Sequence, residues 1–393
     1  MKKIFALIVI FAALFLCSCR ILNTNEAFEQ IRIGVILPLS GEYADAGKAA
    51  LDGMELAVSE CNQMGGIDNR KIQLCIYNSA GIPEKAAQIA RNIIADNNVV
   101  ALTGAYSSTE ALEIKLVAEE LGVPYVAYSA SDEGLSKGAE YTFQSSLNSE
   151  IQGAALAYYM AYKRRFIKPA IMLNIDAAEI YSRGLGRKTA QAWADFSGRQ
   201  PLLMTYSAQQ KSFAGQIRKC IEDDVDVIVL PAYYDCALRF IKEARQLNYR
   251  GAFAGGDSYD TPLFTGTEND LGDCFFAAPY YIGSKAEKNV EFIELMQKYH
   301  KRQPGGAEAM GYDGMRFLFK AMQNAYSPES IAVNLRSMRT FDSVSGNMEL
   351  HPRKKIMMHP VFIMNASGKK KSPVRIWTVD TERLKNYRHY EQD

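Results

Sequence analysis

Short apolar runs suited to β-strands alternate with amphipathic helical segments along most of this 393-residue chain. In the first half, the pattern predicts strands at 31–37, 71–77, 99–103 and 125–128. Helices are expected between them at 47–63, from Pro83 onward and at 108–121. Because parallel strands need crossover connections, this alternation predicts a parallel sheet with helices on both faces.

The second half of the chain repeats the alternation. The predicted strands lie at 170–175, 202–206, 225–230 and 251–254, and the helices near 182–196, 211–223 and 235–247. A strand at 274–279, long helices near 286–301 and 308–325, and a β-rich tail at 347–350, 360–365 and 374–378 follow. Two such runs predict an α/β protein with two doubly wound parallel-sheet lobes.

No low-complexity linker separates the two halves, so we expect the lobes to be joined by several crossovers. We assign 31–145 and 280–340 to a first lobe, and 146–279 and 341–378 to a second lobe. Residues 379–393 form a polar C-terminal tail.

The N-terminal residues are typical of an export signal. Lys2 and Lys3 precede the apolar run 4–16, which is too short to cross a bilayer as a helix. Cys19 follows Leu16 and Ser18 in a pattern similar to the bacterial lipobox, whose cysteine is acylated and begins the mature chain. We therefore expect a lipoprotein signal at 1–19, a polar tether at 20–30 and membrane attachment through the lipid only. The alternative is an ordinary cleaved signal in which Cys19 has no role.

Composition excludes several classes of partner and chemistry. The 45 Lys and Arg residues balance 44 Asp and Glu residues, so the chain lacks the basic field that binds nucleic acid. The four histidines lack metal-ligand spacing and no cysteines form a CxxC motif, so we expect neither a metal nor a cofactor. Two interpretations stay open for Cys61 and Cys75, a disulfide or free thiols like those expected at Cys220, Cys236 and Cys274.

Ligands of open α/β sheets bind beyond the carboxyl ends of the strands, so the loops after strands carry the candidate site. The loop 38–47 is not a phosphate loop, because five residues separate its glycines instead of four and Ala49 follows Lys48. In the loop 104–110, Ser107 and Glu110 have capping-box spacing at a helix start. A helix N-terminus with adjacent hydroxyls attracts a carboxylate, although a plain cap explains the same motif.

Donor-rich and aromatic residues follow other predicted strands. Ser129 and Ser131 come directly after the strand 125–128 and carry no counter-charge. In the second half, Tyr181, Tyr233 and Asp257 occupy equivalent loops. A carboxylate that faces donors across a cleft would complement an ammonium group, and tyrosines offer flat apolar walls with a polar tip. Surface or hinge packing is the alternative for each tyrosine.

The order and spacing of several short motifs resemble one family of proteins. The motifs include Pro38-Leu39-Ser40-Gly41, Leu51-Asp52-Gly53, Gly65-Gly66-Ile67, Gly122-Val123-Pro124, Gly255-Gly256-Asp257 and Gly311-Tyr312-Asp313. From about residue 31 to 371, the chain resembles the type I periplasmic solute-binding proteins that serve branched-chain amino acid ABC transporters. This family is typified by leucine-binding proteins. The resemblance implies the two-lobed Venus-flytrap fold, no enzymatic activity, and closure of the lobes around a small ligand.

The resemblance also implies a role for each candidate residue of the first lobe. Ser107 and Ser108 match the serines that hold the carboxylate of an amino acid ligand. Ser129 matches a backbone contact to the same group, and Ser131 matches a residue that contacts both ends of the ligand.

In the second lobe, Tyr181 and Tyr233 match aromatic residues that close over the ligand. Asp257 matches the acidic residue that binds the α-amino group. Tyr312, in the part of the chain assigned to the first lobe, matches a residue bordering the cleft. The implied partners are an amino acid and an ABC transporter permease, and we expect a monomer, because lobe closure needs no second copy.

The chain departs from the family pattern at several positions. Ala46 stands where many amino-acid binders have an aromatic residue, and 78–82 lacks the usual acidic loop. Tyr106 and Tyr128 are bulkier than expected. These departures concern the side-chain pocket, so the sequence does not assign leucine, isoleucine or valine as the ligand.

Other functions remain as alternatives. A hydrolase is the least supported, because no histidine lies near Ser107 or Ser129 in the sequence and no G-x-S-x-G motif occurs. The same scaffold also serves envelope sensors, regulatory lipoproteins and receptors for small amides such as urea. A blocked cleft would favour a sensor, and a non-binding Asp257 would favour an amide receptor.

Overall fold

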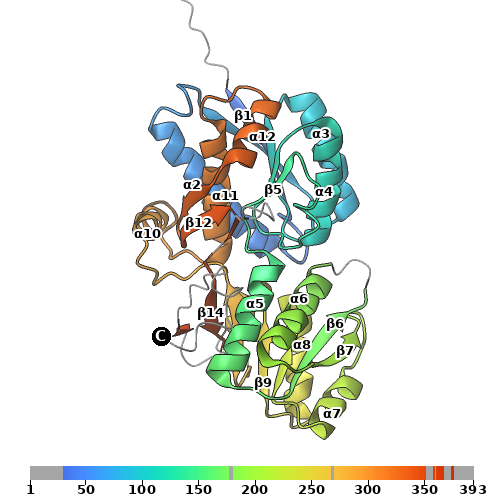
Figure 1. Ribbon diagram of the computed structural model, residues 1–393. Helices are drawn as coiled ribbons and strands as arrows, with labels where there is room; N and C mark the ends of the chain where they lie inside the picture. Colours follow the sequence, from blue (N-terminus) through green and yellow to red (C-terminus); the bar gives the residue numbers. More distant parts are fainter. Residues whose placement is uncertain are drawn as a thin grey trace, which may run out of the picture.

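The computed structural model describes residues 30–176, 180–266, 270–350, 357–358, 360–366 and 373–375, which form the two lobes in Figure 1. The first lobe contains a five-stranded parallel sheet in the order β2-β1-β3-β4-β5. Its strands are β1 (Ile31–Leu37), β2 (Ile72–Asn78), β3 (Ala101–Gly104), β4 (Tyr125–Ala127) and β5 (Thr142–Gln144). The strands β1, β3 and β4 are largely buried, as expected for a sheet covered on both faces, whereas the edge strand β2 is mostly half-buried or exposed.

Helices cover both faces of the first sheet. They are α2 (Ala44–Gln63), α3 (Pro83–Asn97), α4 (Ser108–Leu121), α10 (Glu287–His300), α11 (Gly306–Met322) and α12 (Pro328–Ser337). Residues of α2, α10 and α11 share one apolar cluster with one face of the sheet, and residues of α3 and α4 form the cluster on the other face. Figure 1 shows how α11 and α12, late in the chain, lie among the earliest elements.

The second lobe contains a seven-stranded sheet in the order β15-β14-β10-β9-β8-β6-β7. Its parallel strands are β6 (Pro169–Asn174), β7 (Leu202–Tyr206), β8 (Val227–Val229), β9 (Ala252–Gly255) and β10 (Cys274–Ala278). The late strands β14 (Phe362–Asn365) and β15 (Pro373–Arg375) add to one edge in antiparallel order. The expected α/β fold with two parallel-sheet lobes is therefore confirmed.

The helices of the second lobe are α5 (Ser149–Tyr158), α6 (Ile180–Ser197), α7 (Ala214–Glu222), α8 (Tyr234–Gln246) and α9 (Pro262–Thr265). A π-helical turn, η1 (Tyr159–Arg164), extends α5, and a 3₁₀ turn, η2 (Asp257–Tyr259), follows β9. The chain passes between the lobes after β5, after β10 and again before β14, so several crossovers join the lobes.

The three-stranded sheet of β11 (Thr340–Ser343), β12 (Gly346–Leu350) and β13 (Met357–Met358) belongs with the first lobe. The Phe341 ring packs edge-on against Phe317 of α11 with centroids 5.4 Å apart, and Val344 N donates to the Asp313 carboxylate. This packing differs from the sequence-based division, which assigned 341–378 to the second lobe. The apolar face of this small sheet is buried against α11, whereas Val361 and Ile363 join the second-lobe core.

Two glycines let α2 and α11 approach closely. A Cβ at Gly53 would lie 2.0 Å from the Glu308 carbonyl oxygen, and a Cβ at Gly311 would lie 2.2 Å from the Ala50 carbonyl oxygen. Both distances are far below van der Waals contact, so neither position accepts a side chain without moving a backbone. Two of the motifs that carry the family resemblance therefore form one helix–helix contact.

Cys61, Cys75, Cys220, Cys236 and Cys274 are free thiols, so the disulfide considered for Cys61 and Cys75 is absent. Among the described residues, no helix is both long and apolar enough to cross a membrane. The predicted signal, Cys19 and the tether up to residue 29 lie outside the described residues, as does the tail 379–393.

Candidate ligand-binding site

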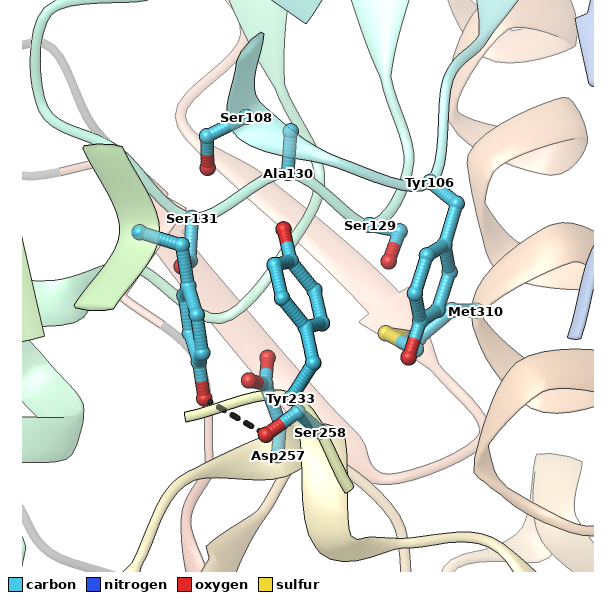
Figure 2. Close-up of a pocket in the computed structure, with 10 residues that line it drawn as sticks. Tyr106, Ser108, Ser129, Ala130, Ser131, Tyr233, Asp257, Ser258 and Met310 are labelled. Atoms are coloured by element: carbon cyan, nitrogen blue, oxygen red, sulfur yellow. Dashed lines mark hydrogen bonds between the residues drawn. The ribbon is translucent and has the colours of Figure 1, made fainter. Parts of the chain in front are cut away.

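A small cavity lies between the lobes, with a volume of about 30 Å³. Figure 2 shows serines of the first lobe on one side and Asp257 and Ser258 of the second lobe on the other. The residues that line it are Tyr106, Ser108, Ser129, Ala130, Ser131, Tyr181, Tyr233, Asp257, Ser258 and Met310. Most residues selected from the sequence therefore meet in one place, although they come from loops after different strands.

The loop between β3 and α4 brings the helix N-terminus to the cavity. Gly104 and Ala105 both have left-handed backbone conformations, with φ of 134° and 58°. A Cβ at Gly104 would lie 2.0 Å from the Ile36 carbonyl oxygen, so the turn requires glycine. Left-handed geometry at a non-glycine residue such as Ala105 carries strain, which is common at functional sites.

The two adjacent serines of this loop have different partners. Ser107 caps α4: its Oγ accepts from Glu110 N at 3.2 Å and donates to Glu110 Oε2 at 3.1 Å. Ser107 is thus committed to the capping box and does not line the cavity. Ser108 does line it, and its Oγ is buried without a hydrogen-bond partner among the described residues, which makes it a free donor beside the helix N-terminus.

The loop after β4 supplies two further serines. Ser131 Oγ lies 3.2 Å from Ser149 Oγ, and Ser149 N donates to the Ser131 carbonyl oxygen at 2.9 Å. Ser149 begins α5, so these bonds fix the loop against the chain where it crosses to the second lobe. Ser129 lies nearby on the cavity wall and is 8% exposed.

Asp257 is the one carboxylate among the described residues that line the cavity. It starts η2 directly after β9, and its backbone N–H donates to Gln152 Oε1 at 3.1 Å. Burial raises the pKa of Asp257 to about 7, although hydrogen bonds from Tyr181 and Gln152 act in the opposite direction. A cation placed beside this carboxyl would favour its charged form.

Tyrosine rings fill much of the space between the lobes. Figure 2 shows the Tyr233 ring in the middle of the cavity, with its hydroxyl directed toward the first lobe. Its centroid lies 5.3 Å from that of Tyr181, and Tyr181 Oη donates to Ser258 Oγ at 3.1 Å. Tyr43 lies 5.0 Å from Tyr233 and 5.1 Å from Tyr106, so aromatic contacts cross from lobe to lobe.

Tyr43, Tyr106 and Met310 were not among the residues selected from the sequence. Tyr43 follows β1, in the loop 38–47 where only Ala46 was expected at the side-chain pocket. Tyr106 was noted only as bulky, yet it lies in the same strand-to-helix loop as Ser108. Position after a strand was therefore an available signal for both tyrosines. Met310 lies within α11 and had no such signal.

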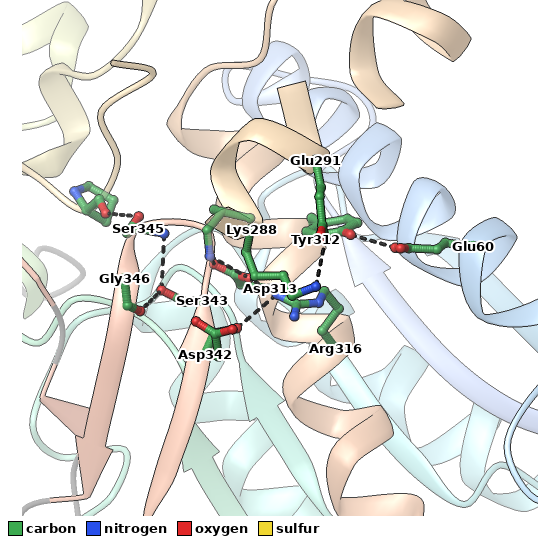
Figure 3. Close-up of polar contacts among 12 residues, drawn as sticks. Glu60, Lys288, Glu291, Tyr312, Asp313, Arg316, Asp342, Ser343, Ser345 and Gly346 are labelled. Atoms are coloured by element: carbon green, nitrogen blue, oxygen red, sulfur yellow. Dashed lines mark hydrogen bonds and ion pairs between the residues drawn. The ribbon is translucent and has the colours of Figure 1, made fainter. Parts of the chain in front are cut away.

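Tyr312 does not border the cavity, contrary to the expectation from the resemblance. Its Oη donates to Glu60 Oε2 at 2.5 Å, as Figure 3 shows, and its ring packs 4.7 Å from that of Phe292. Met310, two positions earlier on α11, lines the cavity instead. Residues two apart point to nearly opposite sides of an α-helix, so only one of them can face the ligand space.

The cavity thus has hydroxyl donors and a helix N-terminus on one wall and a carboxylate on the other. This arrangement suits a small solute with an anionic and a cationic end. Two α/β lobes joined by crossovers, with such a cavity between them, define a solute-binding protein of the Venus-flytrap type.

The chain belongs to the family of periplasmic binding proteins, whose pattern it matches over residues 30–371. It is 25% identical over 336 residues to the Leu/Ile/Val-binding protein homolog 8 of Brucella abortus, with 80% of this chain and 82% of that protein covered.

Two solved structures share the fold. The leucine binding protein LivK of Thermotoga maritima has a TM-score of 0.81 at 23% identity, covering 89% of this chain and 99% of that one. The branched-chain amino acid binding protein LivJ of Streptococcus pneumoniae, solved in complex with isoleucine, has a TM-score of 0.78 at 24% identity, covering 87% and 97%.

Proposed function

We propose that this protein is the extracytoplasmic receptor of an ABC importer and captures an amino acid or a similar small zwitterion between its lobes. The observation that carries this proposal is the pairing of Ser108 with Asp257 across one cavity. Ser108 has a buried hydroxyl that no other described residue satisfies, beside a helix N-terminus, which suits the α-carboxylate. Asp257 suits the α-amino group, because an ammonium compensates the cost of a buried carboxylate.

The assignment of the remaining contacts follows from this pose. Ser129 and Ser131 lie on the carboxylate side, and Tyr181 and Tyr233 close over the ligand from the second lobe. Ser107 contributes indirectly, by capping the helix whose N-terminus carries Ser108. The names of the relatives support the amino-acid class, because these proteins are named as binding leucine, isoleucine or valine.

We further propose that Cys19 carries a lipid that holds the mature protein at the membrane, where a permease receives the ligand. The support is the sequence alone, in which a short positive start and an apolar run precede Leu16, Ser18 and Cys19. Metabolic labelling with a radioactive fatty acid tests this proposal, with Cys19→Ser as the matched variant. Incorporation that persists in Cys19→Ser would contradict the assignment.

A thermal-shift screen of the protein lacking residues 1–19 tests the proposed ligand class. The protein is first refolded to remove carried-over ligand and is then mixed with single amino acids, urea, acetamide or benzoate. A ligand that binds only the folded state raises the melting temperature. We expect shifts with one or a few amino acids, and none with benzoate, which has a carboxylate but no ammonium group for Asp257.

Two variants separate the proposal from its alternatives. Asp257→Asn should abolish the shift given by an amino acid, whereas Ser108→Ala should reduce it less, because the helix N–H groups remain. A shift with urea that survives Asp257→Asn would indicate an amide receptor. If the refolded protein responds to no solute, a sensor or regulatory lipoprotein would replace the transport receptor.

A further inference from the structure

A second cavity lies next to the first and shares the Tyr233 side chain as a wall. Its volume is about 330 Å³, roughly ten times that of the first cavity. Glu42 and Tyr43, in the loop after β1, line it from the first lobe. Asp235 and Arg239 of α8 are among the residues that line it from the second lobe. We call this space the polar chamber.

The first cavity is too small for a whole amino acid with a side chain. One water molecule needs about 10–15 Å³ by the same measure, so 30 Å³ holds only two or so. The ring of Tyr233 lies in the middle of that space (Figure 2). A ligand held between Ser108 and Asp257 must therefore displace this ring or extend past it, and the adjoining free volume is the polar chamber.

The chamber has carboxylates from both lobes. Burial raises the pKa of Glu42, and the nearby charge and hydrogen bond of Asp235 raise it further, whereas the charge of Arg239 lowers it. Arg239 is held against the second lobe, because its guanidinium donates to the carbonyl oxygens of Ala208 and Gln210 and lies over the Phe213 ring. Glu42 and Asp235 thus share a hydrogen bond beside Arg239, and a cation entering the chamber would take the place of the proton that they share.

We propose that the polar chamber is the side-chain subsite of the binding site, that Tyr233 separates it from the main cavity, and that the ligand is an amino acid whose long side chain ends in a positive charge. This inference rests on the proposed function, because it requires the α-carboxylate and α-amino group to lie between Ser108 and Asp257. The side chain then passes the rings of Tyr43 and Tyr233, whose faces attract cations, and ends between Glu42 and Asp235.

The charge pattern also disfavours aliphatic side chains. A leucine, isoleucine or valine side chain would end beside polar groups to which it offers no hydrogen bond. Because Glu42 and Tyr43 come from one lobe and Asp235 from the other, a cation between the two carboxylates would also hold the lobes closed.

Isothermal titration of the refolded protein with lysine, arginine, leucine and norleucine tests the inference. Norleucine has the chain of lysine without the ammonium group, so the comparison isolates the charge. We expect lysine or arginine to bind at least tenfold more tightly than norleucine. The double variant Glu42→Gln, Asp235→Asn should reduce that preference at least tenfold, while Glu222→Gln at the end of α7, away from the chamber, should leave it unchanged.

The outcomes distinguish this inference from the proposed function. If leucine or norleucine binds as tightly as lysine and arginine, and binding requires Asp257, the proposed function stands and the side-chain assignment is wrong. A preference for lysine that survives the double variant would likewise overturn the role of the chamber. If none of these four amino acids binds, the side-chain assignment fails, and the thermal-shift screen against the other amino acids decides the proposed function.

Discussion

Lys188 of α6 forms an ion pair with Glu133 of the first lobe, with Nζ 2.6 Å from Oε2. The same ammonium lies 3.9 Å from Glu150 Oε2 in α5. Glu133 follows β4 in the first lobe, and Lys188 belongs to the second lobe. The pair therefore spans the two lobes, and separating them would break it.

Replacement of this ion pair should weaken the closed state slightly. We expect Lys188→Met to reduce ligand affinity about two- to fivefold, because exposed ion pairs contribute up to about 1 kcal/mol. The loss should shrink at high salt. Titration calorimetry at two salt concentrations measures both effects. Lys219→Met is the control, because Lys219 pairs with Asp223 within the second lobe at 2.8 Å; an equal loss in that variant would contradict the role in closure.

Ligand affinity should depend on pH through Asp257. The pKa of this carboxyl is raised by burial to about 7 in the ligand-free protein, and a bound ammonium should lower it. Binding then releases a proton below pH 7, so affinity should rise by up to about tenfold per unit from pH 5 to 7 and level off above. Titrations across this range in buffers of different ionisation enthalpy detect the released proton.

The variant Asp257→Asn provides the control for this pH dependence. It should lose the slope between pH 5 and 7, and at pH 8 it should bind at least about a hundredfold more weakly, because a buried ammonium loses its counter-charge. A wild-type affinity that is flat from pH 5 to 7 would mean that the Asp257 carboxyl does not pair with the ligand.

Asp313 should matter for stability. Its carboxylate accepts from Val344 N at 3.0 and 3.2 Å and pairs with Arg316 Nη1 at 3.0 Å, which connects α11 to the β11–β12 hairpin (Figure 3). Asp313→Ala leaves these donors without an acceptor and should lower the free energy of unfolding by about 1–3 kcal/mol. Denaturant titration measures the change. Asp313→Asn keeps an acceptor for Val344 N and should lose less; equal losses would argue against the hydrogen bond.

The contact between α2 and α11 should not tolerate a methyl group. We expect Gly311→Ala to destabilise the protein by about 1–3 kcal/mol or more, since its Cβ would lie 2.2 Å from the Ala50 carbonyl oxygen. Gly215→Ala, in the open surroundings of α7, should instead be neutral or stabilise by up to about 1 kcal/mol. Thermal unfolding of both variants makes the comparison. Similar melting temperatures would show that the helices can separate without loss.

Periodicity predicts most of the fold correctly. The strands β1 and β7 and the helix α4 have the bounds expected from their apolar patterns, and most other elements shift by a few residues at their ends. The helix α5 escaped prediction because it is buried on almost all sides and so has no apolar stripe. The helix α12 has a Ser327 cap and Pro328 in its first turn, so its signal was present in the sequence.

The site was predictable only in part. Ser108, Ser129 and Asp257 follow strands, and the rule that ligands bind at strand ends suffices to select them. The polar chamber was not predictable, because it needs Glu42 and Asp235 to meet from different lobes. How closely two side chains from different lobes approach cannot be read from their positions in the sequence. The expectation for Tyr312 was wrong for a similar reason, because a family motif does not say which side of α11 faces the cavity.

The close contact between α2 and α11 has a consequence for how the molecule is made. A chain that emerges N-terminus first completes all the parallel strands of the second lobe before α11 exists. Until then β1 and α2 have no partner for the apolar faces that α11 later covers. The first lobe is therefore begun first, but its core stays open until α11 has been made, and during that interval its apolar faces need protection from aggregation.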